Sequence, residues 1–392
     1  MQVSVFSRKN LVVLASMMKG GNRTFRKLAA HEGAHLVFGP MAFATNIVQK
    51  NPYDLGLITP NPDLGFQGRK SMGGKREPFI PQIAGSQVAD FCEAAKIVQE
   101  NIFRCTGQVS FDGLNINSGC PQPFILKKDS GVALLKDSRS LGTLAAAVAA
   151  LKKILGDTPV TVKIRTGYDL PPLAPSLKEI IQTLEHAGTD AVILHARFRE
   201  DRYNTRANWD HISRAIEYRD RMPIIGNGDI FSVEDYQRMV EETHCEGVAL
   251  GRGALLRPWI FSEIISGKTT DLNPLARARY FGAFFEQLEK DFSDDLLQLK
   301  DLARFHMGWF FGHSMGTDFQ LWNGEQFFPD HFKHSWPTLK KEVDSELRAL
   351  GRGGCDKEPS GYEVYAQTCR MLRRSPAAET NWIRALGKRR NF

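Results

Sequence analysis

The chain has 392 residues, of which 42% are hydrophobic and 24% are charged, with a formal net charge of +7. This composition is typical of a folded globular protein with one large domain and a smaller one. No run of about eighteen apolar residues occurs, so no transmembrane helix is expected. A strand-like run starts at Leu11 and leaves no room for a signal peptide. A cytoplasmic location is therefore expected, with a nuclear one left open.

The six cysteines and ten histidines show no metal-ligand spacing, and no CxxC pair occurs. No metal site is therefore expected, and the cysteines are expected to be reduced. The positive charge is concentrated at one end, because from Arg370 onward seven basic residues face one acidic residue, Glu379. An acidic partner is expected to bind this part, and nucleic acid is the commonest one. A solvated basic tail without a partner is the alternative.

Strand and helix patterns alternate from residue 11 to residue 250. Eight short apolar runs predict strands at Leu11–Ala15, His35–Phe38, Phe79–Ala84, Val109–Ile116, Val160–Ile164, Ala191–His195, Pro223–Gly226 and Gly247–Leu250. Helical spacing predicts helices at Arg23–Ala30, Val88–Glu100, Leu141–Leu155, Ser176–Ala187, Trp209–Tyr218 and Val233–Glu242. Eight parallel strands over about 250 residues predict an α/β fold, a (β/α)8 barrel.

The remaining segments divide the chain further. Residues 49–75 are rich in Asn, Pro and Gly and predict a long surface excursion. We assign residues 1–265 to the barrel and 266–392 to a helical domain that ends in the basic tail. Within that domain, helical patterns cover 275–315 and 337–350, and the aromatic stretch 319–336 between them reads as an insertion.

Cys120 is the one cysteine in a special setting. It lies in Asn115-Ile-Asn-Ser-Gly-Cys-Pro121, where turn chemistry at the end of a strand presents a thiol. An inert structural cysteine is the alternative. Asn115 and Asn117 share a face with the thiol, and paired amide side chains cost stability unless they bind something. The segment therefore predicts a site.

In a (β/α)8 barrel, the chemistry gathers at the C-terminal ends of the strands. Nearly every predicted strand here ends in polar residues or glycine: Ser16, Met17, Gln82, Asn115, Asn117, Cys120, Lys163, Arg165, His195, Arg197, Asn227, Asp229, Gly251 and Arg252. A lone lysine or histidine among these would more often be an edge or core residue. Together on one rim they predict a functional site.

Glycine-bearing loops follow the last two strands, as Ile225-Gly-Asn-Gly-Asp229 and Leu250-Gly-Arg-Gly253. Barrels of this kind bind phosphate at this place, where backbone amides approach an anion closely and Arg252 lies nearby. A phosphate site with Lys, His and Gln around the barrel mouth favours flavin mononucleotide (FMN), with Lys163 beside the electron-rich part of the ring and Gln82 at its edge.

The sequence resembles the tRNA-dihydrouridine synthase family, in motifs that run in order from Ala15 to Trp309. The matching segments are Met17 in an Ala-Pro-Met element, Gln82 in a Gln-hydrophobic-x-Gly element, Asn115–Pro121, Gly131–Asp137, Val162–Gly167, Leu194–Arg197, Asp201–Tyr203, Asn208-Trp209, Ile225–Ile230, Gly251–Ala254, Pro258-Trp259 and Arg304-Phe-His306 with Trp309. In this order the motifs are highly specific.

The resemblance implies an FMN enzyme that, after reduction by NADPH, delivers hydride to C6 of a uridine in tRNA while a cysteine protonates C5. It implies Cys120 as the acid, and Asn117, Arg197, Arg304 and His306 as substrate-binding residues. The implied cofactor-binding residues are Met17, Gln82, Lys163, His195, Asn227, Gly228, Gly251 and Arg252.

Four positions depart from the family's pattern. Ser16 stands where proline is usual, Asn115 where aspartate is usual, Phe198 where threonine is usual, and Phe305 where lysine is usual. Two alternative functions stay open: another FMN-dependent barrel oxidoreductase that acts on a small molecule, and a catalytically silent tRNA-binding paralogue. The first is disfavoured because such enzymes need no basic helical appendage. The modified uridine and the oligomeric state are not determined by the sequence.

Overall fold

The computed structural model describes residues 5–61, 77–107, 111–201, 205–270, 272 and 274–311. The chain divides into two compact units. Among the described residues, the first, here the barrel unit, comprises 5–254 and 258–267, and the second, here the helical unit, comprises 255–257 and 268–311. None of the described helices is long and apolar enough to cross a membrane.

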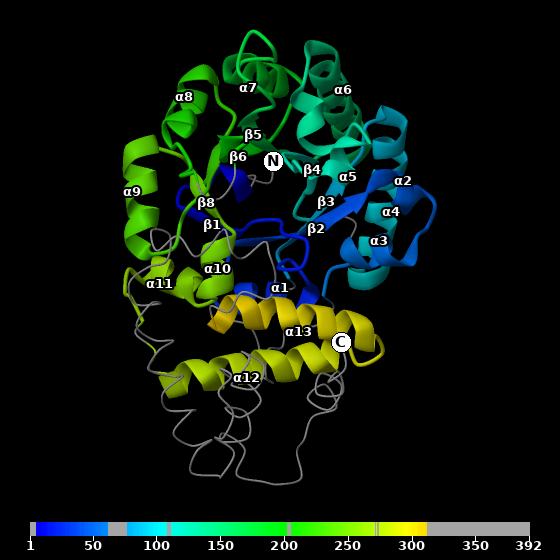
Figure 1. The fold of residues 1–392 in the computed structure, drawn as a ribbon. Helices are drawn as coiled ribbons and strands as arrows, with labels where there is room; N and C mark the ends of the chain where they lie inside the picture. Colours follow the sequence, from blue (N-terminus) through cyan, green and yellow to red (C-terminus); the bar gives the residue numbers. More distant parts are fainter. Residues whose placement is uncertain are drawn as a thin grey trace. The chain divides into compact units, whose positions relative to one another are not determined.

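Eight parallel strands close into a barrel in the order β1 to β8, which confirms the predicted (β/α)8 fold (Figure 1). The strands are β1 Leu11–Leu14, β2 Leu36–Phe43, β3 Phe79–Ala84, β4 Leu114–Ser118, β5 Val160–Gly167, β6 Ala191–Phe198, β7 Ile224–Asn227 and β8 Gly247–Leu250. The last strand returns to the first and closes the ring, with Leu11 paired to Gly247 and Leu14 to Leu250.

Helices surround this ring of strands (Figure 1). Those of the barrel unit are α1 Arg23–His31, α2 Ala44–Val48, α3 Pro52–Leu57, α4 Val88–Thr106, α5 Pro123–Leu126, α6 Ser138–Leu155, α7 Leu177–His186, α8 Asp210–Tyr218, α9 Val233–Thr243 and α11 Ile260–Ser266, with the short 3-10 helices η1 Val5–Ser7 and η2 Gly131–Leu135. Helix α10 Arg252–Leu256 begins in the barrel unit and ends in the helical unit. Side chains cap several helix starts, as Ser176 does by accepting from the Glu179 amide of α7.

Several predicted boundaries differ from the observed elements, as β2 continues to Phe43 and α4 to Thr106. Residues 49–75 were predicted as a long surface excursion, and within them Pro52–Leu57 forms the helix α3, because Asn51 caps its first amides and proline is compatible with a first helical turn. Residues 62–76 lie outside the described part. The strand predicted at Val109–Ile116 runs instead from Leu114 to Ser118, because Gly113 takes a φ of 147° that ends extended pairing there.

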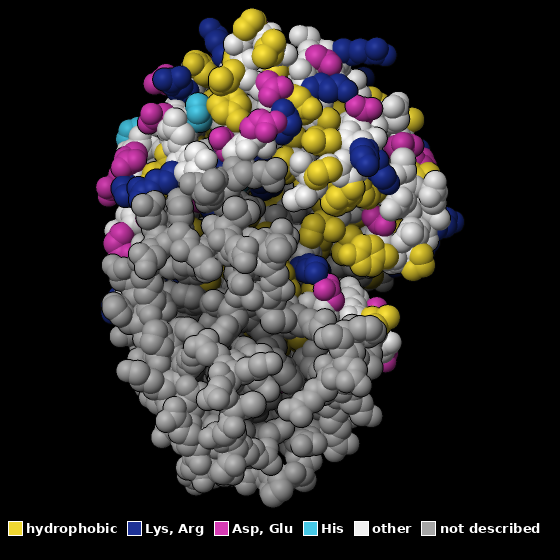
Figure 2. Space-filling model, in the orientation of Figure 1, with side chains coloured by type: hydrophobic (Ala, Val, Ile, Leu, Met, Phe, Trp, Pro, Cys, Tyr) yellow, Lys and Arg dark blue, Asp and Glu magenta, His cyan; other side chains and the backbone are white. Residues whose placement is uncertain are grey.

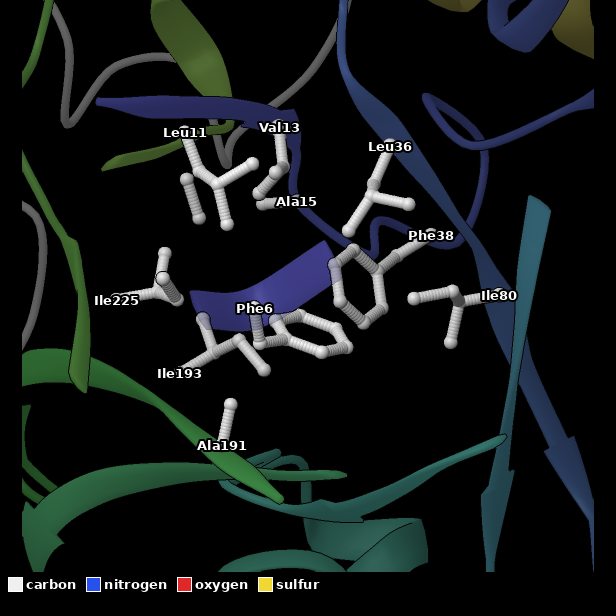
Figure 3. Packing of buried hydrophobic residues seen from close by; sticks show 11 residues of the cluster. Phe6, Leu11, Val13, Ala15, Leu36, Phe38, Ile80, Ala191, Ile193 and Ile225 are labelled. Atoms are coloured by element: carbon white, nitrogen blue, oxygen red, sulfur yellow. The ribbon is translucent and has the colours of Figure 1, made fainter. Parts of the chain in front are cut away.

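Phe6 of η1 fills the N-terminal end of the barrel interior (Figure 3). It is 1% exposed and packs in an apolar cluster with Leu11, Val13, Ala15, Leu36, Phe38, Ile80, Ala191, Ile193, Ile225 and Ala249. Side chains alternate along a strand, so the residue two places further points into the same interior. Those residues are polar: Gln82 follows Ile80, His195 follows Ile193 and Asn227 follows Ile225. The interior therefore changes from an apolar to a polar layer toward the C-terminal ends.

The helical unit contains α12 Pro274–Asp291 and α13 Leu296–Phe311. The predicted helical run 275–315 is thus divided at 292–295. The two helices pack through aromatic rings, with Phe281 stacked on Phe310 at 4.0 Å between centroids. The predictions for 319–336, 337–350 and the basic tail lie outside the described residues, and the boundary at 265/266 stays a prediction.

The visible surface of the barrel unit mixes lysine, arginine, acidic and hydrophobic side chains (Figure 2). Basic side chains do not gather into one large patch on this described face.

Candidate active site

A pocket of about 540 Å³, counting its open mouth, lies at the C-terminal ends of five strands. It is lined by Ala15, Ser16 and Met17 after β1, Lys163 of β5, His195 of β6, Asn227 to Phe231 after β7, and Ala249 and Gly251 to Gly253 after β8. Seven of the eight residues predicted to bind a cofactor line it; the eighth, Gln82, does not. This is the end of the barrel where the chemistry was predicted.

Lys163 is a cation in this pocket without a carboxylate partner. It makes no hydrogen bond or ion pair with any residue that the structure describes. Burial, and then the nearby Arg165, lower the pKa of Lys163 to about 8, while the partly exposed side chain still reaches the pocket. Such an ammonium is stabilised by an electron-rich ligand atom.

His195 is held as a neutral imidazole. Burial lowers the pKa of His195 well below its ordinary value, and the cations Lys163, Arg165, Arg197 and Arg252 lower it further. Arg197 Nη1 lies 3.2 Å from His195 Nε2. Because arginine only donates, Nε2 accepts and Nδ1 carries the proton. His195 therefore presents an N–H donor rather than a second positive charge.

Asp229 joins the two arginines of the rim. Its carboxylate accepts from Arg197 Nη2 at 3.0 and 2.8 Å, from the Ala207 amide at 2.7 Å and from Arg252. Arg252, predicted to bind phosphate, is thus already ion-paired, and its charge is shared between Asp229 and any ligand. Asp229 was predicted on the rim but without a role. The available signal was its place at the end of a predicted strand whose two neighbours are followed by Arg197 and Arg252.

The glycine loops leave room for a ligand at one position in particular. A Cβ on Gly253 would lie 2.0 Å from the Ile230 carbonyl oxygen, and Gly228 has a φ of 129°, so local structure requires both glycines. Gly251 is different, because a Cβ there would meet only Met17 Sδ, at 3.7 Å. The space beside Gly251 is a cradle that a side chain would fill. With Lys163 and Arg252 nearby, the pocket fits a group with an anionic end and an electron-rich ring.

Cys120 lies on the turn after β4, in an apolar setting. It is partly exposed and packs against Met41, Ala84 and Ile125. Burial raises the pKa of the Cys120 thiol, and its interactions with Lys163 and Arg165 only partly oppose this. The residue is therefore a protonated thiol at neutral pH, which suits an acid better than a nucleophile.

Asn117 ties that turn to the barrel interior. Its Oδ1 accepts from the backbone amides of Gly119 at 3.2 Å and Cys120 at 3.0 Å, and its Nδ2 donates to Gln82 Oε1 at 2.7 Å. Asn117 pairs in register with Lys163 of the next strand. The thiol turn and the pocket cation thus belong to adjacent strands at the same level.

Gln82 and Asn115 lie deeper than the rim on which they were predicted, because each is 0% exposed. Gln82 Oε1 also accepts from Ser16 Oγ at 2.7 Å, and Gln82 Nε2 donates to Asn115 Oδ1 at 2.7 Å. Asn115 Nδ2 then donates to Thr161 Oγ1 at 2.8 Å. Thr161 was not predicted as a site residue, although it stands two places before Lys163 on the same strand and so faces the same interior.

Arg165 of β5 connects the turn after β4 with the end of β6 and the loop that follows it. Its Nε donates to the Gly119 carbonyl at 3.0 Å, and its Nη1 donates to the carbonyl oxygens of Phe198 at 2.6 Å and Asp201 at 3.4 Å. The guanidinium is buried, with 5% exposed. It therefore fixes the backbone next to Cys120 against the loop after β6.

The two site residues predicted on α13 belong to the helical unit. The Arg304 side chain lies outside the described part. His306 is 0% exposed and packs against Phe284, with 4.7 Å between ring centroids. Burial lowers the pKa of His306 to about 3, so its ring is neutral at pH 7. A tRNA contact by either residue stays a prediction, and for His306 it requires the side chain to become exposed.

The fold and the rim define a (β/α)8 barrel with a cationic, ligand-sized pocket and a partly exposed thiol at the same end. No group of three or more His, Cys, Asp or Glu side chains that could hold a metal occurs in the part of the chain that the structure describes. The family model of dihydrouridine synthases (Dus) matches residues 13–343. The chain therefore belongs to the dihydrouridine synthase family.

The relatives carry more specific names. A Xenopus tropicalis protein named tRNA-dihydrouridine(47) synthase [NAD(P)(+)]-like is 29% identical over 301 residues, which cover 77% of this chain and 43% of that protein. The Coprinopsis cinerea tRNA-dihydrouridine(47) synthase [NAD(P)(+)] is 28% identical over 311 residues, with 76% and 42% covered. The chain thus spans less than half the length of these relatives. A solved 2-naphthoyl-CoA reductase complex superposes with a TM-score of 0.49 and 12% identity, over 67% of this chain and 51% of that one.

Proposed function

We propose that the chain is an FMN-dependent tRNA-dihydrouridine synthase that reduces the C5–C6 double bond of a uridine in tRNA, with NADPH as reductant. Membership of the dihydrouridine synthase family and the names of the relatives support the reaction and the tRNA substrate. One observation carries the proposal: Asn117 and Lys163 are paired in register on neighbouring strands. Asn117 accepts from the backbone of the Cys120 turn, and Lys163 lines the pocket, so the thiol turn and the pocket are held together.

Bound FMN would supply the hydride, after its own reduction by NADPH. Lys163 would stabilise the electron-rich edge of the ring, and the neutral His195 would donate its Nδ1–H to it. Gly228, Gly251 and Arg252 would hold the phosphate, with Arg252 divided between the phosphate and Asp229. Met17 and Asn227 complete the walls of this pocket.

Cys120 would donate the proton to C5. The donor must be protonated before the reaction, and burial raises the pKa of this thiol. Asn117 and Arg165 hold the turn that carries the thiol. Asn117 accepts from the backbone amide of Cys120, and Arg165 donates to the carbonyl oxygen of Gly119. Asn117 would bind the substrate base. The predicted contact between Arg197 and the substrate requires the buried Arg197 side chain to become exposed.

The helical unit and the basic tail would bind the tRNA backbone. Seven basic residues from Arg370 onward could contact phosphates, with Arg304 and His306 assigned to the same task from the sequence. Phosphate contacts supply affinity without sequence readout. A helical tRNA-binding domain over 266–392 is part of this proposal.

The direct test is to incubate purified protein, tRNA and NADPH and to measure dihydrouridine by nuclease digestion and mass spectrometry. We expect the protein to carry FMN and the mass of one uridine to rise by two hydrogens, with the position mapped from the fragments. A protein that takes up FMN but reduces only small pyrimidines would instead be a small-molecule oxidoreductase. Protein that binds tRNA without taking up FMN would be a silent binding protein.

A further inference from the structure

Helix α5 and the two residues after it carry an exposed aromatic ring and two exposed lysines close to the thiol. Phe124 is 52% exposed, and Lys127 and Lys128 are exposed. These three residues are here called the α5 platform. A single exposed phenylalanine needs no explanation. Phe124, however, is the nearest in sequence to Cys120 among the exposed large apolar side chains that the structure describes.

The backbone places the three platform residues on one side of a helical turn. The Lys127 amide donates to the Pro123 carbonyl oxygen at 3.0 Å. The Lys128 amide donates to the Ile125 carbonyl oxygen at 3.0 Å. Residues three and four positions apart are neighbours on such a turn. Both lysines therefore lie on the same side as Phe124.

The platform is fixed to the turn that carries the thiol. Ile125 of α5 is 0% exposed and belongs to the apolar cluster against which Cys120 packs. A Cβ on Gly131 would lie 2.5 Å from the Cys120 carbonyl oxygen and 2.7 Å from Ile125 Cγ2, so this backbone packs closely on both. Because four residues span at most about 14 Å, Phe124 lies within that distance of Cys120.

The charge of the platform is positive and is not neutralised by nearby acids. The Lys127 side chain makes no hydrogen bond or ion pair with any residue that the structure describes. Lys128 Nζ lies 4.1 Å from the centre of the Phe43 ring, a contact that positions the ammonium and leaves its charge in place. Asp129, the next residue along the chain, is ion-paired with Lys136 at 2.6 Å. Both platform lysines are therefore open to an anionic group.

An aromatic ring beside lysines is a combination that binds single-stranded nucleic acid, because bases stack on the ring and phosphates bind the ammonium groups. The next step rests on the proposed function. A uridine that is reduced in the pocket must first leave its stack, and the nucleotide beside it then loses a stacking partner. Phe124 offers that nucleotide a new partner near the Cys120 turn.

We propose that the α5 platform binds the nucleotide next to the uridine that is reduced, with its base stacked on Phe124 and its phosphate on Lys127 and Lys128. Stacking of this kind tolerates any base. The platform therefore selects an unpaired neighbour and not a particular sequence, and the substrate is a uridine beside an unpaired nucleotide. The platform does not contact the reacting atoms, so it acts on the binding of tRNA and not on the protonation step.

Phe124→Ala removes the stacking ring, and Phe103→Ala is its matched control. Phe103 is 51% exposed, almost the same as Phe124. It lies in the last turn of α4, and the helices of such a barrel run back from the strand ends that carry the site. Phe103 is therefore at the opposite end of the barrel from the thiol. Phe124→Trp keeps an aromatic face and serves as the conservative replacement.

The experiment measures binding of the FMN-loaded full chain to labelled tRNA by fluorescence anisotropy, without NADPH. It compares the unchanged tRNA with two others, which are abasic at the 5′ or the 3′ neighbour of the uridine mapped above. The wild type, Phe103→Ala and Phe124→Trp should bind one of the abasic tRNAs about five- to hundredfold more weakly than the unchanged tRNA. Phe124→Ala should bind the unchanged tRNA equally weakly and lose nothing further with that abasic tRNA. Melting temperatures check that the variants are folded.

The lysines are tested by the salt dependence of the same binding. Lys127→Gln should lower the slope of log affinity against log salt concentration by about 0.7, the contribution of one phosphate contact on a single strand. Lys153→Gln, at an exposed position in the last turn of α6, is the control and should leave the slope unchanged. An unchanged slope in Lys127→Gln would remove the phosphate from the platform.

Wild-type affinity of Phe124→Ala for the unchanged tRNA would overturn the inference. So would losses on both abasic tRNAs that are as large in Phe124→Ala as in the wild type. In either case, dihydrouridine formation by the unchanged protein would still support the proposed function. Absence of dihydrouridine from tRNA treated with the unchanged protein would instead remove the proposed function and this inference with it.

Discussion

Arg197 Nη2 donates to both carboxylate oxygens of Asp229, at 3.0 and 2.8 Å, and the Arg197 side chain is fully buried. Removing one partner of a buried pair leaves an uncompensated charge, which costs about 3–5 kcal/mol. Asp229→Asn should therefore lower the free energy of unfolding in urea by that amount. The backbone is not the cause, because asparagine tolerates the φ of 56° at this position.

The matched control for this pair is Asp169→Asn. Asp169 pairs with Arg199 at the surface, where the two side chains are 35% and 23% exposed, and such pairs contribute below about 1 kcal/mol. Equal losses in the two variants would show that the Asp229 pair is no more important than an ordinary surface pair.

The Cys120 thiol is the second test. Cys120→Ala should keep FMN and its reduction by NADPH but slow reoxidation of the reduced flavin by tRNA about 10²- to 10⁴-fold, which is the usual contribution of a general acid. Cys120→Ser should be nearly as slow, since a hydroxyl is a much weaker acid. Burial raises the pKa of the thiol above its ordinary 9.0, so the wild-type rate should persist to about pH 9 and fall above it. Reoxidation at the wild-type rate in Cys120→Ala would assign the proton to another group.

Much of this fold could be predicted from local pattern. Runs such as Val160–Ile164 are too short for helices and too apolar for loops, and their alternation with helical segments predicts the barrel. Helix α3 was not predicted, because Pro52 favours a loop by itself, although proline also starts helices when a capping residue such as Asn51 precedes it.

The candidate site could be predicted as a set of positions but not as a set of bonds. Strand ends are local features, and they identified Lys163 and His195 as residues of the pocket. The pairing of Arg252 with Asp229 and the depth of Gln82 depend on contacts between residues 23 and 33 positions apart in the sequence. Residue spacing along the chain carries no information on which donor meets which acceptor across a barrel.

Lys163 should make FMN binding depend on pH. Its pKa is about 8 in this structure, and an electron-rich ligand favours the charged form and raises that pKa. Affinity should therefore be constant below about pH 8 and fall up to about tenfold per unit above it. Lys163→Met should bind FMN more weakly and without this pH dependence, as measured by quenching of flavin fluorescence.

Lys136→Met is the control for Lys163. Lys136 pairs with Asp129 near the surface and does not line the pocket, so this variant should reproduce the wild-type pH profile. A flat profile in the wild type would show that Lys163 does not contact the flavin.

Gly251 and Gly253 should respond to alanine in opposite ways. A Cβ at Gly251 meets only Met17 Sδ at 3.7 Å, so Gly251→Ala should melt within about a degree of the wild type but bind FMN at least about tenfold more weakly. Gly253→Ala places a Cβ 2.0 Å from the Ile230 oxygen and should be destabilised by about 1–3 kcal/mol. Thermal melting and FMN titration of both variants provide the comparison. Unchanged FMN affinity in Gly251→Ala would show that the phosphate does not bind beside Gly251.

His306 should make the protein sensitive to acid. Burial lowers its pKa to about 3 from an ordinary 6.5, so between these values the unfolded chain binds a proton that the folded chain does not. Stability is therefore full above about pH 6.5 and falls as the pH drops, by up to about 1.4 kcal/mol per unit for this group. His306→Phe keeps an aromatic ring against Phe284 but cannot be protonated. Its unfolding free energy, measured in urea at pH 5 and pH 7.5, should fall less with acid than that of the wild type. The control is His186→Gln, at an exposed position of α7, and it should lose as much stability between pH 7.5 and pH 5 as the wild type. If His306→Phe also loses as much stability as the wild type, then the folded protein lets His306 take up its proton.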